Sequence, residues 1–386
     1  MFVYLDNSAT TKPYKESVDA MTKVLTEDFG NPSSLHTLGI AAEKYVRTAR
    51  KNFAQSIGAS EDEVYFTSCG TESDNTALMG VAQAKRRNGK KIITTAVEHP
   101  AILEPARRLE SMGFEVEYIG VDRKCHLDME QLKSAITDDT ILISVMAVNN
   151  ETGTLMPIDE IVKLRDSINK DIIIHTDAVQ GYGKIVMNLN GNYKGVDLMS
   201  VSGHKIHGPK GIGGLYVRKG LNVTPFIIGG GQEKHFRSGT ENTAGIAGFG
   251  KAIEISSGDF EHRIKAMSEA KAFLAKGLEA ELKDIIFNSP EDSAASVLNV
   301  SFMGTRGEVL LHTLEQDGIF ISTGSACSSN KKGQSHVLAA MGLKPKEIEG
   351  AIRFSFSEFN TVEEMEYVLE KVKKAVTRFR KLGSFR

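Results

Sequence analysis

Residues 201–211 read VSGHKIHGPKG and lie between two apolar runs. Apolar residues 196–199 precede this stretch, and the glycine-rich run 211–214 leads from it into Leu215-Tyr216-Val217. The pattern predicts a strand, a polar turn and a second strand, with Lys205 held in the turn. Burial or a neighbouring cation lowers the pKa of a lysine from about 10.4, which makes its amine a nucleophile suited to Schiff-base chemistry. A solvated surface lysine is the alternative interpretation.

Four apolar runs upstream have the same form. Each ends in polar, reactive side chains, and segments of helical periodicity separate most of them. Continuous apolar strands that alternate with helices predict an α/β fold with a mainly parallel sheet covered on both faces. In such sheets the ligand lies outside the carboxyl ends of the strands, which is where these polar clusters fall. The runs are residues 64–66, 91–95, 141–146 and 172–174, and their polar ends are residues 67–73, 98–100, 149–151 and 175–180.

Chain length indicates two domains. At 386 residues the chain exceeds the size at which a single hydrophobic core stops growing. Its 41% apolar and 25% charged residues are typical of a folded protein. We expect a large α/β domain over residues 14–256, and a small α+β domain formed by residues 1–13 and 257–386.

The last third of the chain has its own pattern of elements. Residues 243–282 have helical periodicity, and residues 352–356 alternate as in a half-buried strand. Thr361 and Glu364 have the spacing of a capping box that begins the terminal helix.

Charge and cysteine content exclude several classes of function. The 47 Lys and Arg residues nearly balance the 49 Asp and Glu residues, so no net field would recruit nucleic acid or a membrane surface. We find no basic, apolar leader and no apolar run that could cross a bilayer. Cys69, Cys125 and Cys327 form neither a C-x-x-C pair nor a zinc pattern. Such a sparse, odd set is typical of reduced thiols, so we expect a cytoplasmic protein without a metal site.

Three of the polar clusters supply the groups that one cofactor, pyridoxal phosphate, requires. Lys205 offers the amine, and Asp177 offers a carboxylate to a protonated pyridine nitrogen, which makes the ring an electron sink. Gly70 and Thr71 begin a predicted helix, whose N-terminus attracts a phosphate. Further donors to that phosphate are Ser202, His204 and Thr240.

Each of these residues also has a structural interpretation when taken singly. Asp177 could be a helix cap, Gly70-Thr71 a plain strand-to-helix turn, and His99 an imidazole satisfied within the core. Independent turns would not all carry the groups that one cofactor needs. Together the residues therefore favour a pyridoxal-phosphate site.

Eight short motifs resemble those of the cysteine desulfurases and occur in the same order as in that family. Among them, HTDAVQ at residues 175–180 and SGHK at residues 202–205 contain Asp177 and Lys205. The run RSGT at residues 237–240 and the Ser/Gly-rich segment around Cys327 are similar to those of the NifS/IscS group. The resemblance extends from residue 4 to the region of Arg353. The other motifs lie at residues 4–11, 30–34, 71–75, 148–151 and 324–327.

This resemblance implies the fold of the class V aminotransferases, which is fold type I of the pyridoxal-phosphate enzymes. That fold has a large domain built on a mainly parallel, seven-stranded sheet and a smaller α+β domain. It also implies a homodimer with active sites near the subunit interface, in which Thr240 would reach the cofactor phosphate from the other subunit.

The resemblance further implies roles for individual residues. Lys205 would hold the cofactor and later move protons, and His99 would stack on its ring and take part in acid–base steps. Asp177 would pair with the ring nitrogen and Gln180 with the phenolic oxygen. Phosphate contacts would come from Gly70, Thr71, Ser202 and His204, and the substrate carboxylate would be held by Asn150 and Arg353, of which Asn150 would also contact the cofactor.

The implied reaction converts L-cysteine to L-alanine and leaves the sulfur as a persulfide on Cys327. Residues 322–334 contain almost no apolar side chain, so we expect this segment to be mobile. At roughly 3.3 Å per residue, such a segment would carry Cys327 well over ~10 Å, from the substrate to an acceptor outside. That acceptor would be an iron–sulfur scaffold or a protein that thiolates tRNA or a cofactor. Cys327 could also ligate an iron–sulfur cluster transiently.

Two other classes of function stay open. A selenocysteine lyase or another class V aminotransferase would share most of these residues, and substrate turnover distinguishes them. A non-catalytic sulfur-relay or scaffold protein would keep the fold, although the intact Lys205, Asp177 and Cys327 argue against it. For Cys69 and Cys125 a structural, buried thiol is the preferred interpretation.

Overall fold

A seven-stranded sheet carries the strand–turn–strand unit around Lys205 in the computed structural model, which describes residues 1–323 and 334–382. Its strand order is β2-β8-β7-β6-β5-β3-β4. Only the pairs that include β8 are antiparallel, so the predicted mainly parallel sheet is confirmed. The strands are β2 (Val64–Thr67), β3 (Lys91–Thr95), β4 (Glu115–Ile119), β5 (Thr140–Ser144), β6 (Ile173–Asp177), β7 (Leu198–Ser202) and β8 (Gly213–Val217).

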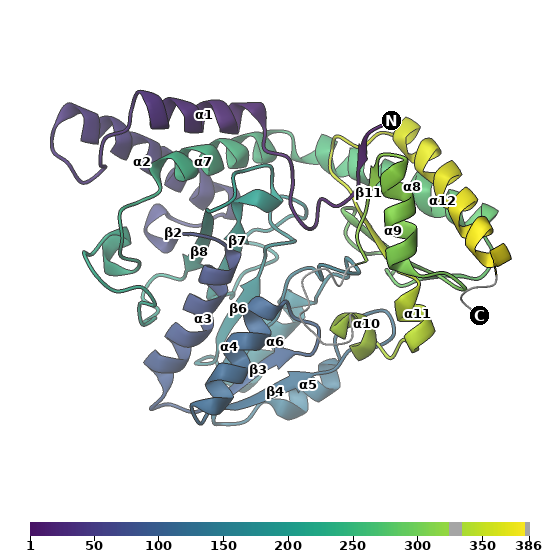
Figure 1. Ribbon diagram of the computed structural model, residues 1–386. Helices are drawn as coiled ribbons and strands as arrows, with labels where there is room; N and C mark the ends of the chain where they lie inside the picture. Colours follow the sequence, from purple (N-terminus) through teal and green to yellow (C-terminus); the bar gives the residue numbers. More distant parts are fainter. Residues whose placement is uncertain (324–333, 383–386) are drawn as a thin grey trace.

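Helices cover both faces of this sheet (Figure 1). On one face, Phe53 of α2 and Phe249 of α7 pack with Val201 in a single hydrophobic cluster. On the other face, Leu78 of α3 and Ile102 of α4 belong to a second cluster. Every residue of β3, β5, β6, β7 and β8 is buried, so apolar residues occupy both faces of these strands. The helices are α1 (Lys15–Thr26), α2 (Thr37–Ile57), α3 (Gly70–Lys85), α4 (Pro100–Ser111), α5 (Met129–Ala135), α6 (Ile158–Ile168) and α7 (Thr243–Gly258).

The close approach of α2 to the sheet depends on Gly214 in β8. A Cβ atom at Gly214 would lie 2.5 Å from Cε1 of Phe53, well inside van der Waals contact. Any larger residue would therefore push α2 away from the strand that follows the Lys205 turn.

A second group of elements surrounds a separate hydrophobic cluster. A three-stranded antiparallel sheet has the order β12-β10-β9, and β1 pairs in parallel with β11. The N-terminal segment therefore lies against the C-terminal part of the chain (Figure 1). The strands are β1 (Val3–Tyr4), β9 (Ile285–Phe287), β10 (Val297–Phe302), β11 (Ile319–Phe320) and β12 (Ala351–Ser355), and the helices are α8 (Phe260–Glu281), α9 (Gly307–Gln316), α10 (His336–Ala340), α11 (Pro345–Glu349) and α12 (Val362–Leu382).

The division at residues 14–256 stays a prediction. Val3 and Leu5 pack in the C-terminal cluster, as that division expects. However, Val337 and Leu338 of α10 pack in the cluster of the large sheet, so a simple cut in the sequence does not separate the two cores.

Two expected elements differ in detail. The helical stretch predicted over residues 243–282 is two helices, because the backbone of Asp259 leaves the helical region between α7 and α8. The predicted half-buried strand at residues 352–356 is buried along its whole length as β12. Its alternation separates Ile352 and Phe354, which face the apolar cluster, from Arg353, which lies among polar groups.

The expected capping box of the terminal helix is present. The amide of Glu364 donates to Oγ1 of Thr361, and the amide of Thr361 donates to Oε2 of Glu364. Within the described ranges, no helix is both long and apolar enough to cross a membrane.

Candidate active site

Lys205 ends a short 3₁₀ turn, Gly203–Lys205, that directly follows β7. The turn is tight: a Cβ atom at Gly203 would lie 2.8 Å from Cγ2 of Ile212 and 3.1 Å from the carbonyl oxygen of Pro209. Nζ of Lys205 donates to the carbonyl oxygens of Ser8 and Ala9, at 2.5 Å and 2.9 Å. The N-terminal segment therefore closes over the lysine from the side opposite the sheet.

Asp177 is the last residue of β6, the strand next to the one that leads to Lys205. Its side chain is almost fully buried, and Oδ1 accepts a hydrogen bond from the amide of Val179 at 2.9 Å. Burial raises the pKa of Asp177 to about 6, while the Val179 amide and the Lys205 ammonium act in the opposite direction. A cation close to this carboxyl, such as a protonated pyridine nitrogen, would restore its ionised form.

Two further acids, Glu98 and Asp74, are buried close to Asp177. Burial raises the pKa of Glu98 to about 8, and burial together with the Asp177 charge raises the pKa of Asp74 well above its usual range. Oε1 of Glu98 accepts hydrogen bonds from Oγ1 of Thr95 and from the amide of Met146. Burial therefore shifts both acids towards the protonated form. The sequence reasoning missed both acids, although Glu98 directly precedes His99.

The N-terminus of α3 forms an open cradle for an anion. Cys69 precedes Gly70 without a capping hydrogen bond from its side chain, so the first helical amides of Gly70 and Thr71 are not satisfied by a cap. A Cβ atom at Gly70 would lie 2.6 Å from Cγ2 of Val179, so only glycine keeps this helix end in place. Oγ of Ser202 is buried nearby and has no hydrogen-bond partner among the described residues.

The other two predicted phosphate residues lie differently. The ring of His204 bonds through Nδ1 to Oγ1 of Thr10 at 3.1 Å, and burial followed by the Lys205 charge lowers its pKa to about 4. Thr240 is exposed, and none of the described hydrogen bonds joins it to another predicted site residue. Its neighbour Arg237 pairs with Glu72, in the first turn of α3, at 2.9 Å.

His99 has a fixed protonation state. It is the N-cap of α4, and its Nδ1 accepts a hydrogen bond from the amide of Ala101 at 3.1 Å. The ring proton must therefore lie on Nε2. Burial, followed by the charge of Lys205, lowers the pKa of His99 to about 4, so at neutral pH the uncharged ring presents Nε2–H as a hydrogen-bond donor. The next imidazole, His336, bonds through Nε2 to the carbonyl oxygen of Glu98.

Gln180 lies between the N-terminal segment and a buried lysine. Its Nε2 donates to the carbonyl oxygen of Ser8 at 2.9 Å, the same oxygen that accepts from Lys205. Its Oε1 accepts from Nζ of Lys184 at 3.1 Å. The sequence reasoning did not single out Lys184, because a lysine after a glycine in a polar turn is usually exposed.

Arg353 and Asn150 meet where the two groups of elements join. Nη1 of Arg353 donates to the carbonyl oxygen of Asn150 at 3.0 Å, and Nη2 pairs with Oδ1 of Asp6 at 2.8 Å. Nε of Arg353 and Oδ1 of Asn150 are buried, and within the described ranges neither has a hydrogen-bond partner. The structure thus brings together the two residues expected at the substrate carboxylate, with hydrogen-bonding capacity to spare.

Cys327 lies outside the described residues, and the two flanks of its segment are described. The backbone of Ser322 pairs with that of Arg353, with N–O distances of 3.2 Å and 2.7 Å. On the other flank, Oγ of Ser335 donates to Oε2 of Glu151 at 2.5 Å. Both flanks therefore end beside residues 150–151 and 353.

The site suits pyridoxal phosphate by its own chemistry. β7, β6 and α3 place four groups at one edge of the sheet. These are an amine, a buried carboxyl, an uncapped helix N-terminus and a buried hydroxyl that has no partner among the described residues. The amine suits the aldehyde carbon of the cofactor, and the carboxyl suits its ring nitrogen. The helix N-terminus and the hydroxyl suit its phosphate. No other described cluster in the chain combines these groups.

The chain is similar to known proteins over nearly its whole length. The aminotransferase class-V family model matches residues 3–368. The chain is 44% identical, over 385 residues, to the cysteine desulfurase IscS of Dictyoglomus turgidum, with all of this chain and 97% of that protein covered. It is also 44% identical to the IscS of Methanosarcina thermophila, with 99% and 93% covered.

Solved structures match over nearly the whole fold. A NifS-like protein superposes with a TM-score of 0.92 at 39% identity, covering 98% of this chain and 100% of its own. The structure of SspA in complex with cysteine superposes with a TM-score of 0.82 at 32% identity, covering 93% and 100%.

Proposed function

Because this chain belongs to the class-V aminotransferase family, in its cysteine desulfurase group, we propose that it converts L-cysteine to L-alanine with pyridoxal phosphate and takes up the sulfur as a persulfide on Cys327. The observation that carries the proposal is the placement of Lys205 and Asp177 at the ends of neighbouring strands, beside the uncapped N-terminus of α3.

The cofactor would be held by residues at the ends of β6 and β7, at the start of α3 and in the adjoining loops. Lys205 would bind its aldehyde carbon, Asp177 its ring nitrogen, and Gln180 its phenolic oxygen. When bound, pyridoxal phosphate supplies an electron-withdrawing ring that stabilises negative charge on the substrate Cα. The phosphate would be held by Gly70, Thr71, Ser202 and His204, with Asn150 against the cofactor and Thr240 contributed by a second subunit.

Two residues would move protons. The Lys205 amine, when not bonded to the cofactor, would carry a proton to or from the substrate carbon. His99 would assist acid–base steps through Nε2, which carries the proton of the neutral ring and can donate a hydrogen bond to a group that develops negative charge.

Arg353 would hold the substrate carboxylate. Asp6 and the carbonyl oxygen of Asn150 fix its Nη2 and Nη1, while Nε faces no partner among the described residues. A planar guanidinium held in this way recognises a carboxylate by geometry as well as by charge.

Sulfur transfer requires a thiolate that can reach the substrate. The Cys327 thiolate attacks the substrate sulfur, an S–S bond forms, and the Cβ–S bond breaks. The carbon fragment keeps the bonding electrons, takes up a proton and leaves as alanine. The position of Ser322 and Ser335 beside residues 150–151 and 353 supports this role, since both flanks of the segment lie at the substrate end of the site.

A second subunit is supported by exposed apolar side chains. Leu25, Phe29, Leu35 and Ile40 are exposed on α1, α2 and their connection, and Ile228 is 82% exposed. Clusters of this kind mark association surfaces. Because Ile228 lies on the same loop region as Thr240, a homodimer formed here would bring Thr240 to the other subunit's site.

The sulfur acceptor would be an iron–sulfur scaffold or a protein that thiolates tRNA or a cofactor. The unpaired thiols of Cys69 and Cys125 support a reducing compartment, which we take to be the cytoplasm.

One assay separates the proposal from its rivals. Purified protein with pyridoxal phosphate and reductant should produce alanine and sulfide from L-cysteine in equal amounts. Turnover of selenocysteine without turnover of cysteine would identify a lyase, and amino-group transfer to a keto acid would identify an aminotransferase. A colourless protein that turns over none of these substrates would support a non-catalytic role.

A further inference from the structure

Lys184 is a buried cation next to the site. Only 5% of its surface is exposed, and among the ion pairs of residues 1–323 and 334–382 none includes it. The charged groups that face it are Lys205, Arg263, Arg353 and Glu358, and three of these four are cations. Burial, followed by the charges of these cations, lowers the pKa of Lys184 to about 7. A buried lysine among like charges destabilises a fold, so its presence calls for a functional reason.

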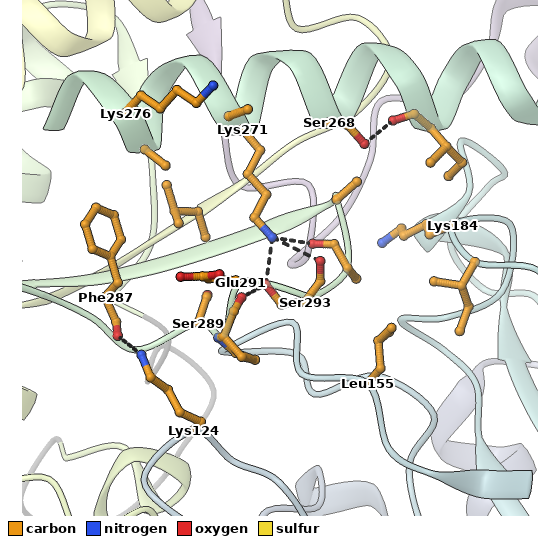
Figure 2. A pocket seen from close by; sticks show the side chains of 18 of the residues that line it. Lys124, Leu155, Lys184, Ser268, Lys271, Lys276, Phe287, Ser289, Glu291 and Ser293 are labelled. Atoms are coloured by element: carbon orange, nitrogen blue, oxygen red, sulfur yellow. Dashed lines mark hydrogen bonds between the residues drawn. The ribbon is translucent and has the colours of Figure 1, made fainter. Parts of the chain in front are cut away.

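Lys184 is one of the residues that line a cavity of about 830 Å³. Most of the other lining residues belong to α8 and to the segment before β10. Figure 2 shows the nitrogen atoms of Lys184 and Lys271 turned toward the space between them. Lys271 is satisfied by Ser293 and Ala294, whereas Lys184 donates to Gln180.

The contact with Gln180 determines the orientation of the amide. Nζ of Lys184 donates to Oε1 of Gln180, so Nε2 of the same amide faces the opposite side. On that side Nε2 meets the carbonyl oxygen of Ser8, which also accepts from Lys205. Pairing Oε1 with a cation polarises the amide and makes Nε2–H a stronger donor.

We propose that Lys184 is a positioning residue: its ammonium holds the Gln180 amide so that Nε2–H is presented to the phenolic oxygen of the cofactor. This inference rests on the proposed function. Donation to that oxygen and a second cation near Lys205 both disfavour protonation of the lysine-bound cofactor. Lys184 therefore lowers the pH at which the bound cofactor gains its proton.

The test is a pH titration of the visible absorbance of the protein with bound cofactor, which needs no turnover. Lys184→Met should raise the midpoint by about one pH unit. Lys276→Met is the matched control, because it removes an exposed lysine from the rim of the same cavity and should leave the midpoint in place. Lys184→Arg, which keeps a cationic donor, should stay close to the unmodified protein.

A double-mutant cycle shows whether Lys184 acts through Gln180. In a Gln180→Ala background the shift caused by Lys184→Met should fall to about half or less, because the amide that transmits the effect is gone. An equal shift in both backgrounds, or no shift in either, would overturn the inference. Lys184→Gln supplies the same comparison if the methionine variant does not fold.

The outcomes of the two proposals remain distinct. If the unmodified protein takes up no cofactor, the proposed function fails. If it takes up cofactor and turns over cysteine while Lys184→Met keeps its midpoint, only the role of Lys184 fails.

Discussion

Nζ of Lys205 lies 2.5 Å from the carbonyl oxygen of Ser8, a residue 197 positions earlier in the chain. Ser8 follows β1, which pairs with β11 in the C-terminal group of elements, whereas Lys205 follows β7 of the large sheet. The reactive amine is therefore held by both groups at once. Relative movement of the two groups would change the surroundings of Lys205 directly.

Arg353→Lys tests the substrate-carboxylate site. The change keeps the charge but loses the planar fork, and hydrogen bonds between charged groups contribute roughly 1.5–3 kcal/mol. We expect KM for L-cysteine to rise at least about tenfold, with bound cofactor retained. Steady-state kinetics and the visible spectrum measure the two quantities. Arg123→Lys, at the surface pair with Glu347, is the control. An unchanged KM would remove Arg353 from substrate binding.

Glu98 provides a prediction about pH and stability. Its pKa is raised from 4.5 to about 8 in the folded protein, so the folded state holds a proton that the unfolded chain releases at lower pH. Its contribution to stability is full below pH 4.5 and is lost as the pH rises through 8. At pH 9, Glu98→Gln should therefore raise the free energy of unfolding by on the order of a few kcal/mol, and the unfolding temperature with it. At pH 5 it should change both quantities little.

Thermal unfolding of the cofactor-free protein at both pH values measures this effect. The exposed Glu366→Gln serves as control, since it should show no such difference between pH 5 and pH 9. A Glu98→Gln variant with an equal effect at both values would show that Glu98 does not change its ionisation between pH 5 and pH 9, and would contradict the raised pKa.

Cys327→Ser tests the persulfide role. Serine cannot attack sulfur to form an S–S bond, so turnover should fall to background while the visible absorbance of the bound cofactor is kept. Cys69→Ser, at the N-cap of α3, should keep most activity. Sulfide release by the Cys327→Ser variant at near the original rate would assign the thiol function to another residue.

The sequence predicted that the polar ends of the buried strands lie together, because the carboxyl ends of parallel strands converge at one edge of the sheet. Strand order could not be read from the chain, so only the structure places Asp177 beside the strand of Lys205. Ser8 contributes only a backbone oxygen, which leaves no side-chain signal. Lys184 escaped notice because the charges that act on it, such as those of Arg263 and Arg353, come from distant parts of the chain. The sequence showed that apolar and polar residues alternate around Arg353. In the structure this alternation separates core residues from Arg353, which lies among polar groups.

Borohydride reduction of the protein with bound pyridoxal phosphate, followed by peptide mass analysis, tests the central claim most directly. The account predicts that the reduced cofactor is found on Lys205, and that Lys205→Ala abolishes both the label and turnover while any cofactor stays non-covalently bound. A stable label on Lys184 or on any other lysine, with Lys205 unmodified, would contradict it.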